Sequence, residues 1–301
     1  MSADPTGFRH VLTSDAGSAE ITEVGASLRA LRIGEVDLVP RYRDGIPAPA
    51  ASGVVLVPWP NRVRDGRWDD DGTVRQLAIS EPALGNASHG LLRFTPYRAV
   101  ETTPGAVTLA AEVFPQTGYP YHLDTRVTYA LTADGLAVTH VITNIGAETA
   151  PVALGTHPYL CVSDTPTADL LLEVDAETWI RTDERNLPVA AEPVDAAHDL
   201  RTPRRVGDVT LDTAYTGIRA GADGRIRGIL HCPDGRRLEL WAGAGFTHLQ
   251  VFTTDRYPGH ELAVAIEPMT APADALNSGI DLRRLAPGES WELSWGISLI
   301  G

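Results

Sequence analysis

Apolar and polar residues alternate over much of this 301-residue chain, and this alternation constrains its fold more than any other feature. The clearest run, near the C-terminus, places large apolar residues at alternate positions: Trp291, Leu293, Trp295, Ile297 and Leu299. Successive side chains of a β-strand point to opposite faces, so this run predicts a strand with one buried face. An earlier segment repeats the pattern with Val127, Tyr129 and Leu131.

Turn signals separate further predicted strands at short intervals. These strands are predicted at residues 107–114, 136–145, 170–174, 226–232, 237–241, 249–253 and 262–266. Asp134-Gly135, Asp223-Gly224 and Pro287-Gly288 are typical of tight turns. Asp234-Gly235 predicts a hairpin that joins the strands at 226–232 and 237–241.

No helical periodicity, internal repeat or low-complexity linker interrupts this pattern, so we expect only short helical turns. The 22 prolines and 28 glycines suit a chain with many loops. The sequence therefore predicts one all-β domain over residues 1–301, a large antiparallel β-sandwich whose sheets pack face to face.

The charge balance narrows the class of partner. The chain has 25 basic and 39 acidic residues, a net charge of -14. Nucleic acids and anionic membranes attract basic surfaces, so the sequence predicts neither as a partner. None of the basic residues is lysine, which excludes a Schiff-base lysine and a phosphate-binding lysine of the Walker type. A small-molecule ligand fits this composition.

Cysteine and histidine spacing predicts neither a disulfide framework nor a metal site. Cys161 and Cys232 lie far apart in sequence, and no His-x-x-x-His pair or compact ligand spacing occurs. The N-terminal residues have no basic and apolar signal segment, and no apolar run reaches the ~20 residues of a membrane span. We expect a cytoplasmic protein, monomeric or homodimeric, that needs no cofactor.

Four polar segments adjoin apolar runs and are candidates for chemistry. Glu267 follows the predicted strand 262–266 and precedes Pro268, so we expect it at the rim of a sheet, where a general base is well placed. The other segments are Trp59-Pro60-Asn61-Arg62, Ser88-His89-Gly90-Leu91-Leu92-Arg93 and Gly155-Thr156-His157-Pro158-Tyr159.

Together these motifs resemble the aldose 1-epimerase, or galactose mutarotase, family. The family pattern occurs in order across nearly the whole chain, as Asn61-Arg62, His89 to Arg93, His157 with Tyr159, Asp212, and Glu267. The prolines and aromatic residues around these motifs are most similar to the bacterial subgroup with sulfoquinovose mutarotase-like proteins. One departure is Tyr97, where family members commonly have tryptophan.

The resemblance implies a cofactor-independent enzyme that interconverts the α and β anomers of a free monosaccharide. In that reaction a base takes the proton of the anomeric hydroxyl and an acid protonates the ring oxygen, which opens the ring. The resemblance gives Glu267 the role of base and His157 the role of acid. It implies that the sugar is held by the remaining motif residues: Asn61, Arg62, His89, Tyr159 and Asp212.

Several alternatives stay open at this point. A non-catalytic sugar-binding domain on the same scaffold has no need of both His157 and Glu267. A glycosidase normally requires two facing carboxylates, and the motifs supply one. Arg62, Arg64 and Arg67 leave room for an anionic sulfo- or phosphosugar. Four aromatic residues are candidates to stack on the sugar: Trp59, Tyr159, Trp241 and Phe252.

Overall fold

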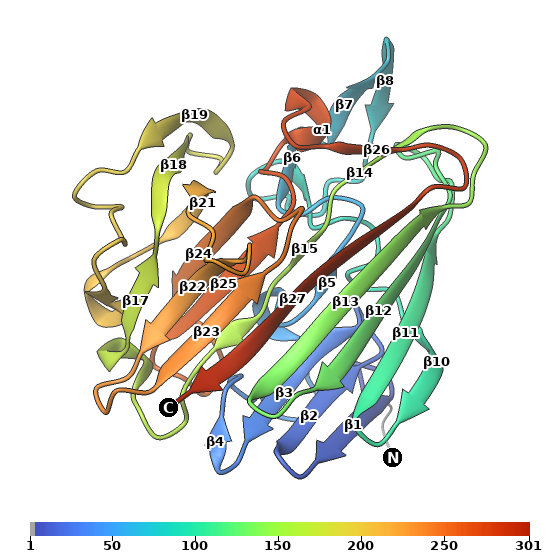
Figure 1. The fold of residues 1–301 in the computed structure, drawn as a ribbon. Helices are drawn as coiled ribbons and strands as arrows, with labels where there is room; N and C mark the ends of the chain where they lie inside the picture. The colour runs from blue at the N-terminus through green and yellow to red at the C-terminus, as the bar shows by residue number, and fades with distance from the viewer. Residues whose placement is uncertain (1–3) are drawn as a thin grey trace.

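The computed structural model describes residues 4–301, which form an assembly of antiparallel β-sheets (Figure 1). Within this part of the chain the only α-helix is α1 (Ala275–Ser278), and short 3-10 turns lie at η1 (Pro49–Ala51), η2 (Thr167–Asp169) and η3 (Val206–Asp208). The structure thus confirms the prediction of an all-β protein with little helix.

A nine-stranded sheet forms one of the two large layers. Its order is β10 (Arg98–Thr103), β11 (Ala106–Val113), β12 (Leu123–Leu131), β13 (Gly135–Asn144), β27 (Ser290–Ile300), β23 (Arg237–Ala242), β22 (Ile226–His231), β17 (Leu171–Val174) and β20 (Arg204–Arg205). The predicted C-terminal strand is β27, which lies at the centre of this sheet. The predicted hairpin joins β22 to β23, with His231 paired to Arg237.

An eight-stranded sheet forms the second large layer. Its order is β19 (Pro188–Pro193), β18 (Ala176–Thr182), β21 (Asp212–Ile218), β24 (His248–Thr254), β25 (Ala263–Met269), β15 (Gly155–Thr156) and β5 (Val55–Leu56), and β16 (Tyr159–Leu160) also pairs with β25. The two large sheets approach closely at Gly228 of β22, where an added methyl group would lie 2.7 Å from the Ile266 side chain of β25.

Smaller sheets complete the fold. A four-stranded sheet contains β1 (Arg9–Ser14), β2 (Gly17–Thr22), β3 (Ser27–Ile33) and β4 (Val36–Asp37). Three two-stranded sheets pair β14 (Ala150–Val152) with β26 (Arg283–Leu285), β6 (Arg62–Arg64) with β9 (Asn86–Ser88), and β7 (Arg67–Asp70) with β8 (Thr73–Gln76).

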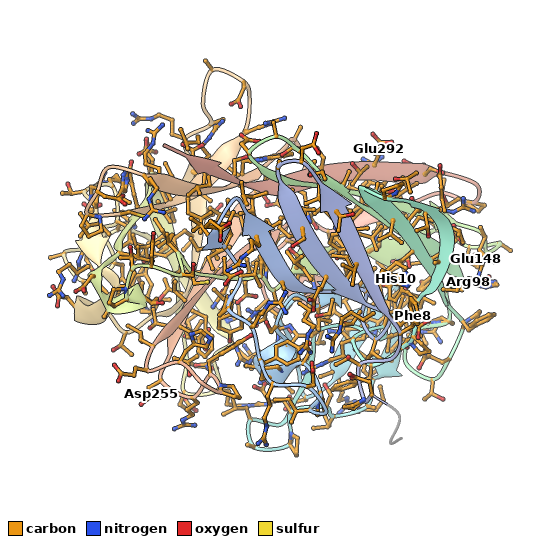
Figure 2. All side chains as sticks on the ribbon, turned by 90° about the horizontal axis from the view of Figure 1, so that it is seen from below. Phe8, His10, Arg98, Glu148, Asp255 and Glu292 are labelled. Atoms are coloured by element: carbon orange, nitrogen blue, oxygen red, sulfur yellow. The ribbon has the colours of Figure 1, made fainter. Side chains whose placement is uncertain are left out.

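Charged side chains lie on the outer surface of the molecule. Seen from below, the exposed residues Arg98, Glu148 and Glu292 lie on the outside of the molecule (Figure 2). No helix among residues 4–301 has the length and apolar character needed to cross a membrane.

The period-2 alternation gives the eight-stranded sheet two different faces. Val264 and Ile266 of β25, with Leu249 and Val251 of β24, belong to the main hydrophobic core. The intervening residues of both strands therefore point to the opposite face. Every residue of β25 is nonetheless buried, so this second face is covered as well. The functional side chains of β24 and β25 lie on this second face.

One buried histidine of the core makes stability depend on pH. His140 of β13 accepts a hydrogen bond at Nε2 from the Trp295 indole, 3.0 Å away, and burial lowers its pKa to about 3. A lowered histidine pKa contributes stability that is present above pH 6.5 and is lost as the pH falls towards the folded-state value. At pH 5 this loss amounts to about 2 kcal/mol for one histidine.

We therefore expect His140→Gln, which keeps an acceptor for Trp295 and takes up no proton, to lose less stability on acidification than the parent. Urea unfolding at pH 7.5 and pH 5 measures this, with the parent protein as control. The two proteins should differ by about 2 kcal/mol in the amount lost. Equal losses would contradict the assignment.

Candidate active site

A cavity of about 340 Å³ opens on the second face of the eight-stranded sheet. Its size lies within the usual range for small-molecule sites. Six of the seven predicted site residues line it, namely Asn61, Arg62, His89, His157, Asp212 and Glu267. Ser88 and Arg93 of the predicted motif around His89 also line it, as does Phe252, a predicted stacking residue. The sequence motifs do not identify its other lining residues: Ala50, Ala51, Ser80, Glu81 and Gln250. A larger cavity of about 600 Å³, beside Asp37, Cys161 and His260, contains none of the predicted residues.

Glu267 lies within β25 and is not at the rim of the sheet, as the sequence had suggested. The strand continues to Met269 because Pro268 pairs with Leu249 of β24. Since Ile266 faces the core, Glu267 faces the cavity, and it is only 2% exposed. The expectation of a strand end was wrong because Pro268 does not end the strand: it stays paired with β24.

His157 occupies a break between β15 and β16, directly beside Glu267. Gly155 pairs with Met269 and Tyr159 with Ala265, so the same register places His157 opposite Glu267. The His157 Nε2 atom lies 3.3 Å from Glu267 Oε1. The His157 backbone is held on its other side, because its carbonyl accepts a hydrogen bond from the Gly53 N–H.

Burial disfavours charge on both members of this pair. It raises the pKa of Glu267 well above its ordinary value, and the negative charge of Asp212 raises that pKa further. Burial lowers the pKa of His157 to about 4, and the positive charge of Arg93 also lowers it. Burial therefore favours the neutral form of each group, a protonated Glu267 beside a neutral His157.

His89 forms another wall of the cavity from a strained turn. Its backbone φ is +65°, its N–H donates to the Asn61 carbonyl, and its ring centre lies 5.7 Å from that of His157. Gly90 follows with φ of +72°, and a methyl group there would lie 2.1 Å from the Val57 carbonyl oxygen. Glycine is required at position 90 for the chain to present His89 to the cavity.

Arg62 is fixed by two carboxylates. Its Nε and Nη2 atoms donate to Glu81 at 2.8 and 3.1 Å, a forked pair. The Nη1 atom lies 3.3 Å from Asn61 Oδ1 and 3.9 Å from Asp212 Oδ2. Glu81 was not predicted, because its role arises only from the pairing of β6 with β9 and the loop before β9.

Asp212 and Gln250 share the cavity floor with Glu267. Gln250 pairs directly with Glu267 across β24 and β25. Its Nε2 donates to Asp212 Oδ1 at 2.6 Å, and Asn186 donates to the other oxygen, Oδ2, at 3.1 Å. Gln250 was missed from the sequence, although its place between Leu249 and Val251 already puts it on the face opposite the core.

Tyr159 does not reach the cavity, so the expectation that it contacts the sugar needs correction. Its side chain is fully buried and stacks on the His157 ring at 5.2 Å, and it therefore supports His157 from behind. Among the other proposed stacking residues, Trp59 lies in the core and Trp241 packs under Arg225. Only Phe252 lines the cavity.

The arrangement can perform acid–base chemistry on a small polar ligand. It has one buried carboxyl group beside one imidazole, surrounded by hydrogen-bonding groups of both kinds. Among residues 4–301, no group of three or more histidine, cysteine, aspartate or glutamate side chains is arranged to hold a metal ion.

Comparison with known proteins supports the same kind of site, because the chain is similar to proteins of the aldose epimerase and galactose mutarotase group. In fold, the chain is similar to the GalM/aldose epimerase homologue from C. elegans, with a TM-score of 0.85, 18% identity and coverage of 97% of this chain and 98% of that one. It is also similar to a galactose mutarotase-like protein from Clostridium acetobutylicum, with a TM-score of 0.84, 16% identity and coverage of 96% and 94%. The fold is the galactose mutarotase-like fold.

Residues 9–298 match the aldose 1-epimerase family, and the chain belongs to that family. Among its relatives is the uncharacterized protein YihR of Escherichia coli K12, which is 32% identical over 304 residues, 95% of this chain and 88% of that one.

Proposed function

We propose that this protein is an aldose 1-epimerase that interconverts the α and β anomers of a free aldose. The contact of 3.3 Å between His157 Nε2 and Glu267 Oε1 carries the proposal. The anomeric oxygen and the ring oxygen are bonded to the same carbon. These two oxygens lie close together, so a base and an acid that lie side by side can serve both of them.

Proton transfer starts from the ionised pair, in which Glu267 is a carboxylate and His157 an imidazolium. The positive charge of Arg62 lowers the pKa of Glu267 and so favours its carboxylate form, while the same charge also lowers the pKa of His157. Glu267 takes the proton of the anomeric hydroxyl while His157 gives its proton to the ring oxygen, and the bond between that oxygen and the anomeric carbon breaks. The aldehyde rotates about one bond and the ring closes on its other face by the reverse transfers.

The remaining cavity residues hold the sugar hydroxyls. Arg62, His89 and Asn61 offer donors, and Asp212 offers acceptors whose direction Gln250 and Asn186 fix. The apolar face of the sugar packs on Phe252, which is half-buried in the cavity wall.

Exchange spectroscopy by NMR at anomeric equilibrium tests the proposal. We expect catalysed exchange for at least one sugar among glucose, galactose, sulfoquinovose and the hexose 6-phosphates. Saturable sugar binding without catalysed exchange would instead identify a sugar-binding domain and refute the enzymatic role.

One observation favours a second candidate, a mutarotase for a sugar with an anionic group at C6, as in the sulfoquinovose mutarotase-like subgroup. Arg93 lines the cavity and lies over the Phe94 ring at 4.6 Å, and no ion pair of the described residues includes its guanidinium. C6 is attached to the carbon next to the ring oxygen. A C6 substituent therefore lies on the side of His157, where the Arg93 charge acts.

For an anionic substrate, Arg93→Met should lower kcat/KM by about 10- to 100-fold, the usual effect of removing a hydrogen bond to a charged group. Methionine keeps the apolar length of the side chain, so exchange of neutral glucose should change much less than exchange of the anionic sugar. The NMR assay on both sugars decides between the candidates. An equal loss for neutral and anionic sugars would contradict anion recognition by Arg93.

A further inference from the structure

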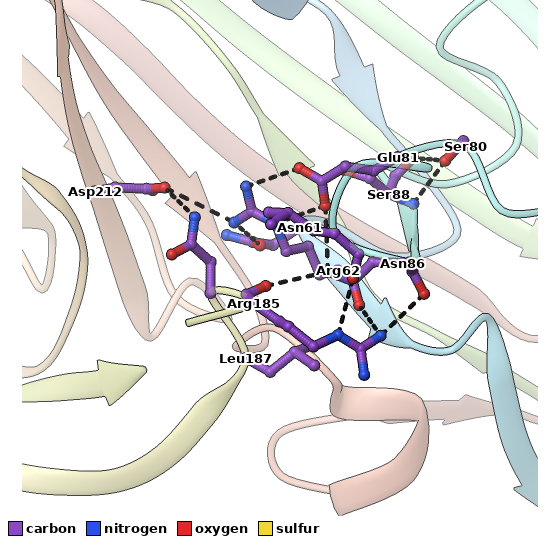
Figure 3. Close-up of polar contacts among 12 residues, drawn as sticks. Asn61, Arg62, Ser80, Glu81, Asn86, Ser88, Arg185, Leu187 and Asp212 are labelled. Atoms are coloured by element: carbon purple, nitrogen blue, oxygen red, sulfur yellow. Dashed lines mark hydrogen bonds and ion pairs between the residues drawn. The ribbon is translucent and has the colours of Figure 1, made fainter. Parts of the chain in front are cut away.

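The turn between β18 and β19 reaches across the sheet and touches the predicted sugar-binding residues. Asp183 closes this turn, because its carboxylate accepts hydrogen bonds from the N–H groups of Arg185 and Leu187. Asn186 adopts a left-handed φ of +57° at its tip. From this turn Arg185 extends towards Asn86 and the polar network of the site (Figure 3). Asn186 of the same turn donates to Asp212.

Arg185 holds the segment before β9 through its guanidinium. Its Nε donates to the Leu84 carbonyl at 2.8 Å, and its Nη2 donates to the Gly85 carbonyl at 3.0 Å and to Asn86 Oδ1 at 3.2 Å. The same Nη2 lies 2.8 Å from Asp65, whose side chain is 57% exposed. Arg185 thus joins the eight-stranded sheet to the β6–β9 sheet.

Asn86 connects Arg185 to Arg62 through Glu81. It is completely buried, and its Nδ2 donates to the Arg185 carbonyl at 3.1 Å and to Glu81 Oε2 at 3.3 Å. Glu81 grips Arg62 with both oxygens. The Arg62 guanidinium therefore has a fixed direction that depends on the segment Arg185 holds.

The network closes on itself through Asp212. Arg62 Nη1 lies 3.9 Å from Asp212 Oδ2, and Asn186, next to Arg185, donates to the same oxygen at 3.1 Å. Hydrogen bonds and this longer ion pair together connect Arg185, Asn86, Glu81, Arg62 and Asp212, so a turn of the Arg62 or Asp212 side chain breaks more than one contact.

We propose that Arg185 and Asn86 are positioning residues, which fix Arg62 and Asp212 in the geometry that binds the sugar. Neither lines the 340 Å³ cavity. Neither contacts the acid–base pair, which is held by β25 and the break before β16. We call the contacts of Arg185 and Asn86 the clamp. Loss of the clamp should weaken sugar binding and leave the proton transfers intact. This inference rests on the proposed function, because it assigns Arg62 and Asp212 to the sugar.

Arg185→Ala is the test, with D-glucose as the probe and the Kd, the KM and the kcat as readouts. We expect the Kd and the KM to rise about tenfold, in the range seen for coupled residues of one network, while the kcat stays within about twofold. In the Arg62→Ala background the same change should raise the Kd much less than tenfold, because one of the two residues through which it acts is missing.

Two matched variants separate the clamp from a simple charge effect. Asp65→Asn removes only the exposed ion pair and tolerates the left-handed backbone at position 65, so its Kd should equal that of the wild type. Arg185→Lys keeps the positive charge but lacks the several N–H donors of the guanidinium group. It should lose most of the affinity for sugar that the alanine variant loses. If the alanine variant does not fold, the Kd of the lysine variant is compared with that of the wild type instead.

A folded Arg185→Ala or Arg185→Lys with wild-type Kd would overturn the proposal. So would a tenfold effect that persists in the Arg62→Ala background, or a fall in kcat at unchanged Kd. Failure of the proposed function is distinct, because it appears as sugar binding without anomer exchange in the wild type, where the Kd comparison still tests the clamp.

Discussion

Glu267→Gln should lower the rate of anomer exchange by about 10²- to 10⁴-fold, the usual contribution of a positioned general base. Glutamine keeps the shape of the side chain and one acceptor oxygen, but it takes up no proton at neutral pH. Because Gln250, Asp212 and Arg62 are unchanged, sugar binding should persist. NMR exchange rates and a sugar titration on the same sample measure the two effects.

Thermal unfolding supplies the control, because the same variant should be more stable than the wild type at pH 7.5. Burial raises the pKa of Glu267 in the folded state well above its ordinary value of 4.5. The stability associated with the neutral carboxyl group is present below pH 4.5 and is lost as the pH rises through the folded-state pKa. Glutamine does not titrate, so the gain should vanish below about pH 4.5. Near-wild-type exchange in a folded Glu267→Gln protein would refute the base assignment.

A higher stability of Glu267→Gln would show that the buried carboxyl group of the site lowers the stability of the folded protein. A carboxyl group that must ionise during catalysis is buried on a sheet face, beside a histidine that is also disfavoured in its charged form. A hydrophobic or amide residue would be accommodated more easily at this position. The site combines low solvent access with groups that exchange protons, and such sites commonly lie at the unstable end of a protein's energetics.

The sequence predicts the layers of this fold well, because alternation is a local property of each strand. Trp291 to Leu299 indicate β27 without knowledge of any partner strand. The same alternation also predicts which way some of the site residues point. Val264 and Ile266 point into the core, so Glu267 must point away from it, and the residues flanking Gln250 place that side chain on the same face.

The rest of the site depends on pairings that no local pattern contains. Glu81 acts on Arg62 only because β6 and β9 lie side by side, and Arg185 reaches Asn86 across a gap of 99 residues. The rim position expected for Glu267 failed for a related reason. Pro268 has no N–H to donate, but it still pairs with Leu249 of β24, and the strand therefore continues through the proline to Met269.

His157→Asn should also lower the exchange rate by about 10²-fold or more, because asparagine fills a similar volume but delivers no proton to the ring oxygen. The double variant with Glu267→Gln should be slower than either single variant by much less than the product of the two losses. Acid and base serve one ring-opening step, so removing one leaves little for the other to contribute. Fully multiplicative losses would mean that the two residues act in separate steps.

The pH dependence of kcat/KM gives a second reading of the same variant. In the wild type the pair must hold one proton, so the rate should fall at high pH when that proton is lost from the pair. Burial lowers the pKa of His157 to about 4, so the acid limb, where a second proton binds and no base remains, lies near pH 4. In His157→Asn only the ionisation of Glu267 matters, and the residual rate should rise with pH and reach a plateau without an alkaline decline. An alkaline decline that survives in His157→Asn would show that another group is the proton donor.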